Sequence, residues 1–185
     1  VNDVLDMSKL ESGTVELTEE PFDLNEVLAQ SRDVIAPTAE SQKLQCTTVG
    51  ECPIRHPHVI GSPVHVRQIL TNLMSNAVKY NRPGGSITGS VEEVSLTEDT
   101  VVFRFTVSDT GLGMSEEFQK KLFEPFSREH PDDAHVSGTG LGMPIVKMLV
   151  NEMGGSISVS SKLGEGSTFV VTLPFKRDPN GAAAP

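Results

Sequence analysis

The chain has 185 residues, of which 37% are hydrophobic, 22% charged and only 5% aromatic, a composition typical of one compact domain with short appendages. Its net charge of -10 argues against a general nucleic-acid-binding surface, and no apolar run approaches the ~20 residues of a membrane span. The two cysteines, Cys46 and Cys52, form no CxxC pair, which excludes a disulfide scaffold and a zinc ribbon and favours a soluble domain in a reducing cytoplasm.

The first expected elements are two helices separated by a short strand. Residues 1–12 (VNDVLDMSKLES) carry apolar side chains at helical spacing, which indicates the end of a longer helix. Residues 14–17 (TVEL) alternate as a short strand. Asp23 can cap the next helix, which we expect to run from Leu24 to about Ile35 because Pro37 interrupts it.

The middle of the chain predicts two hairpins around one long helix. Two β-prone runs, 44–49 and 58–60, are separated by glycine and proline and favour a first hairpin. A helix is expected from Pro63 to about Tyr80. Two further β runs, 86–94 and 101–108, are joined by a polar turn and predict a second hairpin.

The last part of the chain predicts two more helices, two strands and a tail. A short helix is expected from Ser115 to about Leu122, and a long one over 142–153. Strands are expected over 156–160 and 168–174, followed from Lys176 by a linker or disordered end. Because helices and hairpins alternate in blocks, the fold class expected is an α+β sandwich.

The helix over 67–80 (RQILTNLMSNAVKY) carries two distinct stripes. The apolar stripe, which should face the core, consists of Ile69, Leu70, Leu73, Met74 and Ala77. The second stripe, at i, i+4, i+7 and i+8, consists of Asn72, Asn76, Lys79 and Tyr80. For an asparagine pair alone, a solvated helix face would be the better interpretation, but asparagine is a poor helix former, so two in mid-helix without a capping role require an explanation.

Two glycine-rich loops follow, and neither is a dinucleotide or P-loop motif. In 109–114 (DTGLGM) the carboxylate of Asp109 follows a β run, where it can accept a hydrogen bond from an amino group. In 138–143 (GTGLGM) the glycines precede a helix whose free N–H groups can hold phosphate oxygens. Either loop alone would be an ordinary turn, and the absence of GxGxxG, GxxxxGK[ST], HRD and DFG excludes the Rossmann, P-loop and serine/threonine/tyrosine kinase folds.

Taken in order, these motifs resemble the catalytic and ATP-binding domain of two-component sensor histidine kinases. The matching motifs are the N box at 67–80, the first glycine box at 109–114, the F box (LFEPF) at 122–126, the second glycine box at 138–143 and the last glycine box (GEGSTF) at 164–169. The resemblance implies a two-layer α/β sandwich of the Bergerat type, with a mixed sheet packed on three helices and a mobile ATP lid. It also implies three parts: residues 1–13 as the end of a dimerisation and phosphotransfer helix, 14–175 as the catalytic domain and 176–185 as a linker or disordered tail.

The resemblance also assigns roles to residues of the N box. Asn76 matches the asparagine that coordinates Mg²⁺ together with the nucleotide phosphates, and Asn72 would contact phosphates. Lys79 would neutralise phosphate charge and Tyr80 would pack along the adenine. Asn81 departs from the commonest residue after the N-box aromatic but keeps hydrogen-bonding capacity.

The glycine boxes are implied to hold the base and the phosphates. Asp109 would read the adenine amino group, with Gly111 and Gly113 letting the backbone pass close to the base. Thr168 is similar to the family threonine that helps to bind adenine through water, while Ser167 replaces another threonine of that box. The residues implied to approach the phosphates are Gly138, Thr139, Gly140, Leu141 and Gly142.

The function implied is transfer of the γ-phosphoryl group of Mg-ATP to a histidine on the dimerisation domain, for relay to a response regulator. No residue of this chain is expected to act as a general acid or base, and none of its five histidines lies in a phosphoacceptor context. The implied partners are ATP and ADP, the dimerisation and histidine-phosphotransfer domain and a receiver domain, with no nucleic acid and no direct membrane contact. We expect a homodimeric parent acting in the cytoplasm, free or anchored in the inner membrane.

Two alternatives stay open at the level of sequence. One is another ATPase of the same fold, such as a chaperone, a type II topoisomerase or a mismatch-repair ATPase. The other is a pseudokinase that only senses nucleotide. The F box and the short chain argue against the first, and the retained Asn76 and Lys79 argue against the second.

Overall fold

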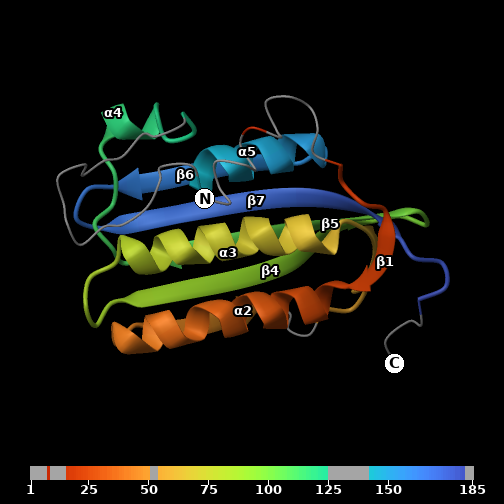
Figure 1. Ribbon diagram of the computed structural model, residues 1–185, viewed down its shortest axis with the longest axis horizontal. Coiled ribbons are helices and arrows are strands. Elements are labelled where there is room, and N and C mark those ends of the chain that lie inside the picture. The colour runs from red at the N-terminus through yellow and green to blue at the C-terminus, as the bar shows by residue number, and fades with distance from the viewer. Residues whose placement is uncertain (1–7, 9–15, 51–53, 125–141, 182–185) are drawn as a thin grey trace.

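The computed structural model describes residues 8, 16–50, 54–124 and 142–181, which form one mixed sheet with helices packed on a single face (Figure 1). The strands are β1 (Glu20–Asp23), β2 (Gln45–Gly50), β3 (His58–Gly61), β4 (Ser86–Leu96), β5 (Thr100–Asp109), β6 (Ser156–Lys162) and β7 (Gly166–Arg177). The helices are α2 (Leu24–Ser41), α3 (Pro63–Lys79), α4 (Glu116–Gln119) and α5 (Gly142–Glu152). Among these helices, none is both long enough and apolar enough to span a bilayer.

The strand order is β1-β3-β7-β5-β4-β2, with β6 also pairing with β7. Only β2 and β4 pair in parallel among the described strands; the other pairs are antiparallel. Strands β3 and β6 share one side of β7, β3 at its C-terminal end and β6 along its first residues. Strands β5 and β7 therefore form the centre of the sheet, and the last residue of β5 lies beside the start of β7.

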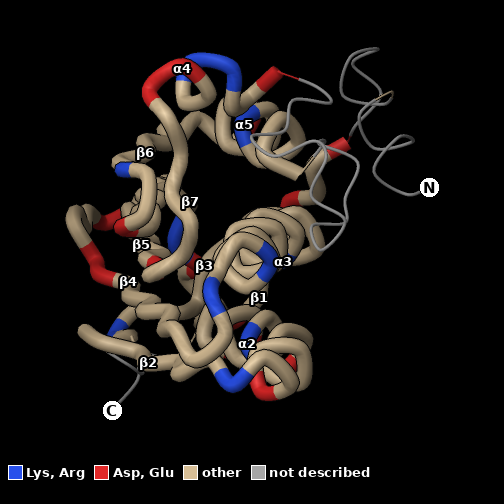
Figure 2. Tube along the Cα trace, turned by 90° about the vertical axis from the view of Figure 1, so that its left-hand side faces the viewer, with Lys and Arg blue, Asp and Glu red and all other residues tan. Residues whose placement is uncertain are grey.

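The helix layer consists of α2, α3 and α5, with α3 lying between the other two (Figures 1 and 2). On the sheet, alternate residues of β5 and β7 face these helices and are buried: Val101, Phe103, Phe105, Val107, Phe169, Val171, Leu173 and Phe175. Helix α3 buries Val66, Ile69, Leu70, Leu73, Ala77 and Val78, with Met74 half-buried. This arrangement confirms the α+β sandwich with a mixed sheet on three helices and the apolar stripe of the N-box helix.

Two expectations about the N-terminal region are wrong. The described residues Glu16 and Leu17 belong to no strand; the strand is β1, which pairs with β3. Helix α2 continues through Pro37 to Ser41, although a proline inside a helix costs about 3 kcal/mol. Ala39 beyond the proline is buried in the core, so tertiary packing offsets the local penalty.

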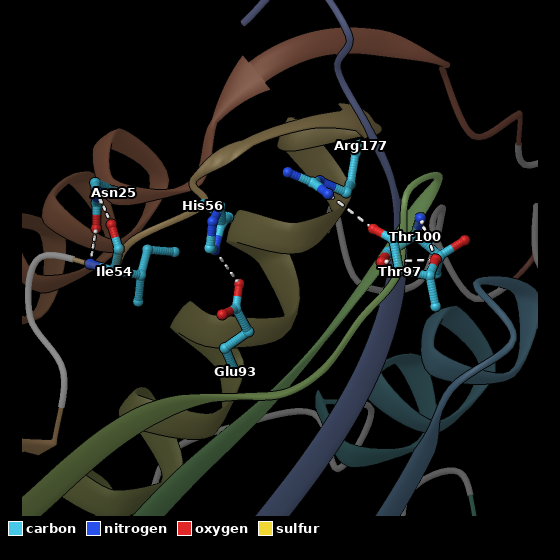
Figure 3. Close-up of polar contacts among 7 residues, drawn as sticks. All are labelled: Asn25, Ile54, His56, Glu93, Thr97, Thr100 and Arg177. Carbon is cyan, nitrogen blue, oxygen red and sulfur yellow. Dashed lines mark hydrogen bonds and ion pairs between the residues drawn. The ribbon is translucent and has the colours of Figure 1, made fainter. Parts of the chain in front are cut away.

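The hairpin expected from 44–49 and 58–60 is also wrong, because β2 and β3 lie at distant positions in the sheet. Polar contacts hold the segment that connects them (Figure 3). The Ile54 N–H donates to Asn25 Oδ1 of α2 at 3.1 Å, and His56 Nδ1 is hydrogen-bonded to Glu93 Oε1 of β4 at 2.8 Å. Chain segments far apart in sequence therefore determine where β2 and β3 pair, and local propensity does not.

The remaining elements follow the expected order with shifted ends. The second hairpin is β4–β5, and Arg177 Nη1 donates to the Thr97 carbonyl of its turn at 2.8 Å (Figure 3). Helix α4 is shorter than expected and is capped by Ser115, whose hydroxyl accepts from the Phe118 N–H. Strand β7 includes Lys176 and Arg177, which we expected to start the tail. The segment expected to form the lid lies outside the described residues, as do residues 125 and 126 of the F box.

Candidate nucleotide-binding site

Asp109 is the last residue of the central strand β5 and lies directly opposite Ser167 of β7. Its Oδ1 accepts a hydrogen bond from the backbone N–H of Gly111 at 2.9 Å. Burial raises the pKa of the Asp109 carboxyl, and hydrogen bonds from the backbone of Gly111 and of Ser167 oppose this effect without cancelling it. The site therefore holds a half-buried, orientated carboxylate that an incoming N–H donor would stabilise.

The loop after Asp109 is fixed by backbone contacts to two other segments. The Leu112 N–H donates to the Tyr80 carbonyl at the end of α3, and the Gly164 N–H of the β6–β7 turn donates to the Leu112 carbonyl, both at 2.8 Å. A Cβ on Gly111 would lie 2.2 Å from the Tyr80 carbonyl oxygen. Gly113 has φ +68°, and its Cβ would lie 2.0 Å from the backbone oxygen of Lys162. Both glycines are thus required for packing of this loop against its neighbours.

A serine of β6 joins the two glycine loops beside Asp109. Ser161 Oγ accepts from the Met114 N–H at 2.8 Å, donates to the Gly166 carbonyl at 3.0 Å and lies 2.8 Å from Ser167 Oγ. Gln119 Nε2 of α4 donates to the Met114 and Ser161 carbonyls, at 3.0 and 3.1 Å. Sequence reasoning missed this network; only the position of Ser167 within the last glycine box pointed to it.

These segments border an open cleft of about 920 Å³. Asp109 lies on one side of the cleft, and Met114, Ser161 and Ser167 lie along it. The volume is in the range of small-molecule sites, which bind mostly through shape with a few placed polar groups. Asp109, which the resemblance implies as the reader of the base, therefore lies at this cleft.

The hydroxyl of Thr168, which the resemblance implies as an adenine contact through water, makes its hydrogen bond on the neighbouring strand. Its Oγ1 is 2.8 Å from Ser108 Oγ on the neighbouring strand, and Thr168 borders the cleft without turning its hydroxyl to Asp109. Because side chains alternate along a strand, Asp109 and Ser167 share one face while Ser108 and Thr168 share the other. Ser167, and not Thr168, therefore lies on the same face of the sheet as the Asp109 carboxylate.

The second stripe of α3 runs from Asn72 to the end of the helix. Asn72 Nδ2 lies 3.4 Å from the carbonyl oxygen of Gly142, the first residue of α5, so this stripe adjoins the start of α5. Asn76 and Tyr80 are half-buried and Lys79 is exposed. Of the second glycine box, only Gly142 and the following methionine are described; Gly138, Thr139, Gly140 and Leu141 lie outside the described residues.

The donor set of these residues suits a magnesium nucleotide. A carboxylate beside a cleft suits an exocyclic amino group, and the N-terminus of an 11-residue helix, α5, is a favourable place for phosphate oxygens. Mg²⁺ prefers oxygen ligands and is commonly held by one or two protein groups plus substrate phosphates. The amide oxygen of Asn76 would be such a ligand.

Comparison with known proteins agrees with this geometry. The family described as "Histidine kinase-, DNA gyrase B-, and HSP90-like ATPase" matches residues 61–177. The sensor histidine kinase GacS of Pseudomonas protegens is 37% identical over 183 residues, covering 96% of this chain and 20% of that protein. The signal transduction histidine-protein kinase BarA of Escherichia coli K12 is 38% identical, covering 97% of this chain and 20% of that protein.

Solved structures show the same relationship. Full-length ShkA in complex with AMPPNP has a TM-score of 0.79 at 30% identity, covering 99% of this chain and 36% of that one. The catalytic domain of histidine kinase ThkA, at 24% identity and a TM-score of 0.68, shares the fold. The chain spans about a fifth of the length of GacS and of BarA. It belongs to the histidine kinase-, DNA gyrase B- and HSP90-like ATPases, and its relatives within that family are sensor histidine kinases.

Proposed function

We propose that this chain is the nucleotide-binding domain of a sensor histidine kinase, and that it presents the γ-phosphoryl group of Mg-ATP to a histidine outside the chain. The observation that carries the proposal is the Asp109 carboxylate, half-buried at the edge of a cleft and held by the Gly111 N–H. The relatives support it, because they are sensor histidine kinases that match nearly the whole chain.

At the base end of the site, Asp109 accepts a hydrogen bond from the adenine amino group. The Ser161 network holds the two loops on either side of the carboxylate, so that its position is set before the nucleotide arrives. Tyr80 packs along the adenine from the end of α3. Guanine carries a carbonyl where adenine carries its amino group, so the same carboxylate repels it.

At the phosphate end, Asn72, Asn76 and Lys79 face the nucleotide from α3, and the first N–H groups of α5 face it from the other side. The amide oxygen of Asn76 would be a ligand for Mg²⁺, which would supply positive charge against the negative charge that develops during transfer. Lys79 adds one positive charge beside the phosphates. Phosphoryl transfer relies on positioning and charge neutralisation, so a site of amides, backbone N–H groups and one lysine is sufficient.

The phosphoryl acceptor and the downstream partners lie outside this chain. We propose a phosphoacceptor histidine on a dimerisation domain, a homodimeric parent in the cytoplasm, and a receiver domain as the next acceptor. Residues 1–13 would then be the end of the dimerisation helix, and the catalytic domain would run from residue 14 through the end of β7 at Arg177, with a short tail after it. The domain itself requires neither nucleic acid nor membrane.

Phosphotransfer to an added dimerisation domain tests this proposal. The chain is fused to a dimerisation and phosphoacceptor domain of its own parent and incubated with ATP labelled in the γ-phosphate. We expect acid-labile phosphate on the histidine of the added domain, a slower transfer with Asn76→Ala, and none on the chain alone. Nucleotide binding without transfer would identify a nucleotide sensor instead, and labelling of the chain alone at His56 or His58 would require a different acceptor.

A further inference from the structure

A second cavity, of about 220 Å³, lies inside the sandwich between α2, α3 and the sheet. Its walls include Leu28 and Ile35 of α2, Leu70 and Met74 of α3, and Ile87 and Phe105 of the sheet. None of its lining residues borders the cleft beside Asp109. The cavity is therefore separate from the nucleotide site, although both are built on α3.

The cavity exists because Gly89 of β4 occupies a position that faces the helices, where the alternation of the strand predicts an apolar side chain. Ile87 and Val91 on either side of it face the helices and are buried, and Val107, its partner on β5, is buried as well. A Cβ added to Gly89 would meet no heavy atom within 4 Å. A glycine inside a strand weakens it and often marks close approach of a ligand or another backbone. Among the described residues no other backbone approaches the position of a Cβ on Gly89, so the glycine leaves open space there.

The cavity has an entrance beside the edge strand β2. Every residue of β2 is exposed, although the strand pairs with β4. Cys46, opposite Ile87, and Thr48, opposite Gly89, lie on the helix side of β2 and also line the cavity. A small molecule can therefore enter from solvent between α2 and β2 without opening of the core.

Apart from Arg32 and a few hydroxyl-bearing side chains, the lining is apolar, and its size suits an uncharged molecule about as large as one aromatic ring. A dry cavity of about 150 Å³ lined by leucine, isoleucine and phenylalanine is sufficient to bind benzene. The ring of Phe105 and the thioether of Met74 both make favourable contacts with aromatic rings. We propose that this cavity is a second ligand site, for a small uncharged aromatic molecule, distinct from the nucleotide site.

Titration with toluene tests the proposal on the full chain. Backbone and methyl chemical shifts are followed for the parent, for Gly89→Leu, and for Thr88→Val on the opposite face of the same strand. Gly89 is not among the glycines with positive φ, so leucine fits its backbone and fills the empty space. We expect saturable shifts at Leu28, Leu70 and Ile87 in the parent and in Thr88→Val, and at least a tenfold weaker response in Gly89→Leu.

Thermal unfolding gives a second, independent reading. Toluene should raise the unfolding midpoint of the parent, because a ligand that binds only the folded state stabilises it by mass action. Gly89→Leu should unfold at a higher temperature without toluene and gain nothing from it. Absence of saturable shifts in the parent would overturn the proposal, whatever the variants do. Equal shifts in parent and Gly89→Leu would place the toluene elsewhere and overturn it as well.

Discussion

Asp109→Asn separates recognition of the base from stability of the fold. The carboxylate holds the Gly111 N–H through Oδ1 at 2.9 Å. Asparagine has nearly the same shape and keeps one oxygen for this bond, but it places an NH2 group where the second carboxylate oxygen was. A donor then faces the adenine amino group, which is also a donor.

The expected loss in affinity follows from the charge on the lost acceptor. A hydrogen bond to a charged group contributes about 1.5–3 kcal/mol, which is roughly a 10- to 150-fold change in Kd. The free energy of unfolding of the variant, in contrast, should rise or stay the same. Burial raises the pKa of Asp109, which means that the ionised form destabilises the folded state at neutral pH, and an uncharged amide removes that penalty.

Calorimetric titration with ATP and with GTP, together with urea unfolding, measures both effects. The variant should lose affinity for ATP by roughly 10- to 150-fold, lose its preference for ATP over GTP, and unfold at the same or a higher urea concentration. If it bound both nucleotides as the parent does, Asp109 would not read the base. If it unfolded at a lower urea concentration, the carboxylate would have a structural role instead.

Three further predictions test the loop, the N box and the titration of the base reader. Gly113→Ala should lower the free energy of unfolding in urea more than Gly84→Ala. Both glycines have positive φ, which destabilises an alanine by about 1–2 kcal/mol, but of the two only at Gly113 would the added Cβ also overlap a backbone oxygen. Asn76→Asp should weaken Mg-ATP binding in calorimetry far more than Asn81→Thr. Only Asn76 is assigned to the metal, whereas the Asn81 side chain is hydrogen-bonded to the backbone of Arg82 and Ser86 in the turn after α3. Equal losses of affinity would contradict the assignment of Asn76 to the site. The raised pKa of Asp109 predicts that ATP affinity falls as the pH drops from neutral into the mildly acidic range, because the protonated carboxyl loses an acceptor. The Asp109→Asn variant should lack this part of the pH dependence, and identical pH profiles of the two proteins would contradict the prediction.

Much of the fold could be predicted because it depends on local patterns. The apolar stripe of α3 has the period of a helix, and the two β runs joined by a polar turn became the β4–β5 hairpin. Strand pairing over long distances could not be predicted in the same way. Strand β2 pairs in parallel with β4, and β3 pairs with β1 and β7. These pairings depend on which neighbouring strands are available in the folded sheet, and the β-prone runs 44–49 and 58–60 carry no local signal for them.

The candidate site shows the same division. Asp109 and the α3 stripe could be proposed as site residues from the sequence because an unusual residue type occupies an unusual position. The choice between Ser167 and Thr168 could not, since two adjacent hydroxyl residues differ only in the face of the strand that each occupies. Ser161 has no unusual neighbour in the sequence, and its role depends on loops that only the fold brings together.

Titration of the purified chain with ATP, in the presence and absence of Mg²⁺, tests the central claim most directly. The residues assigned to the base, the phosphates and the metal all belong to this chain, so it should bind nucleotide without any partner. Calorimetry should show saturable binding of one ATP per chain, tighter with Mg²⁺ than without it. Absence of binding at millimolar ATP would contradict the assignment of this site.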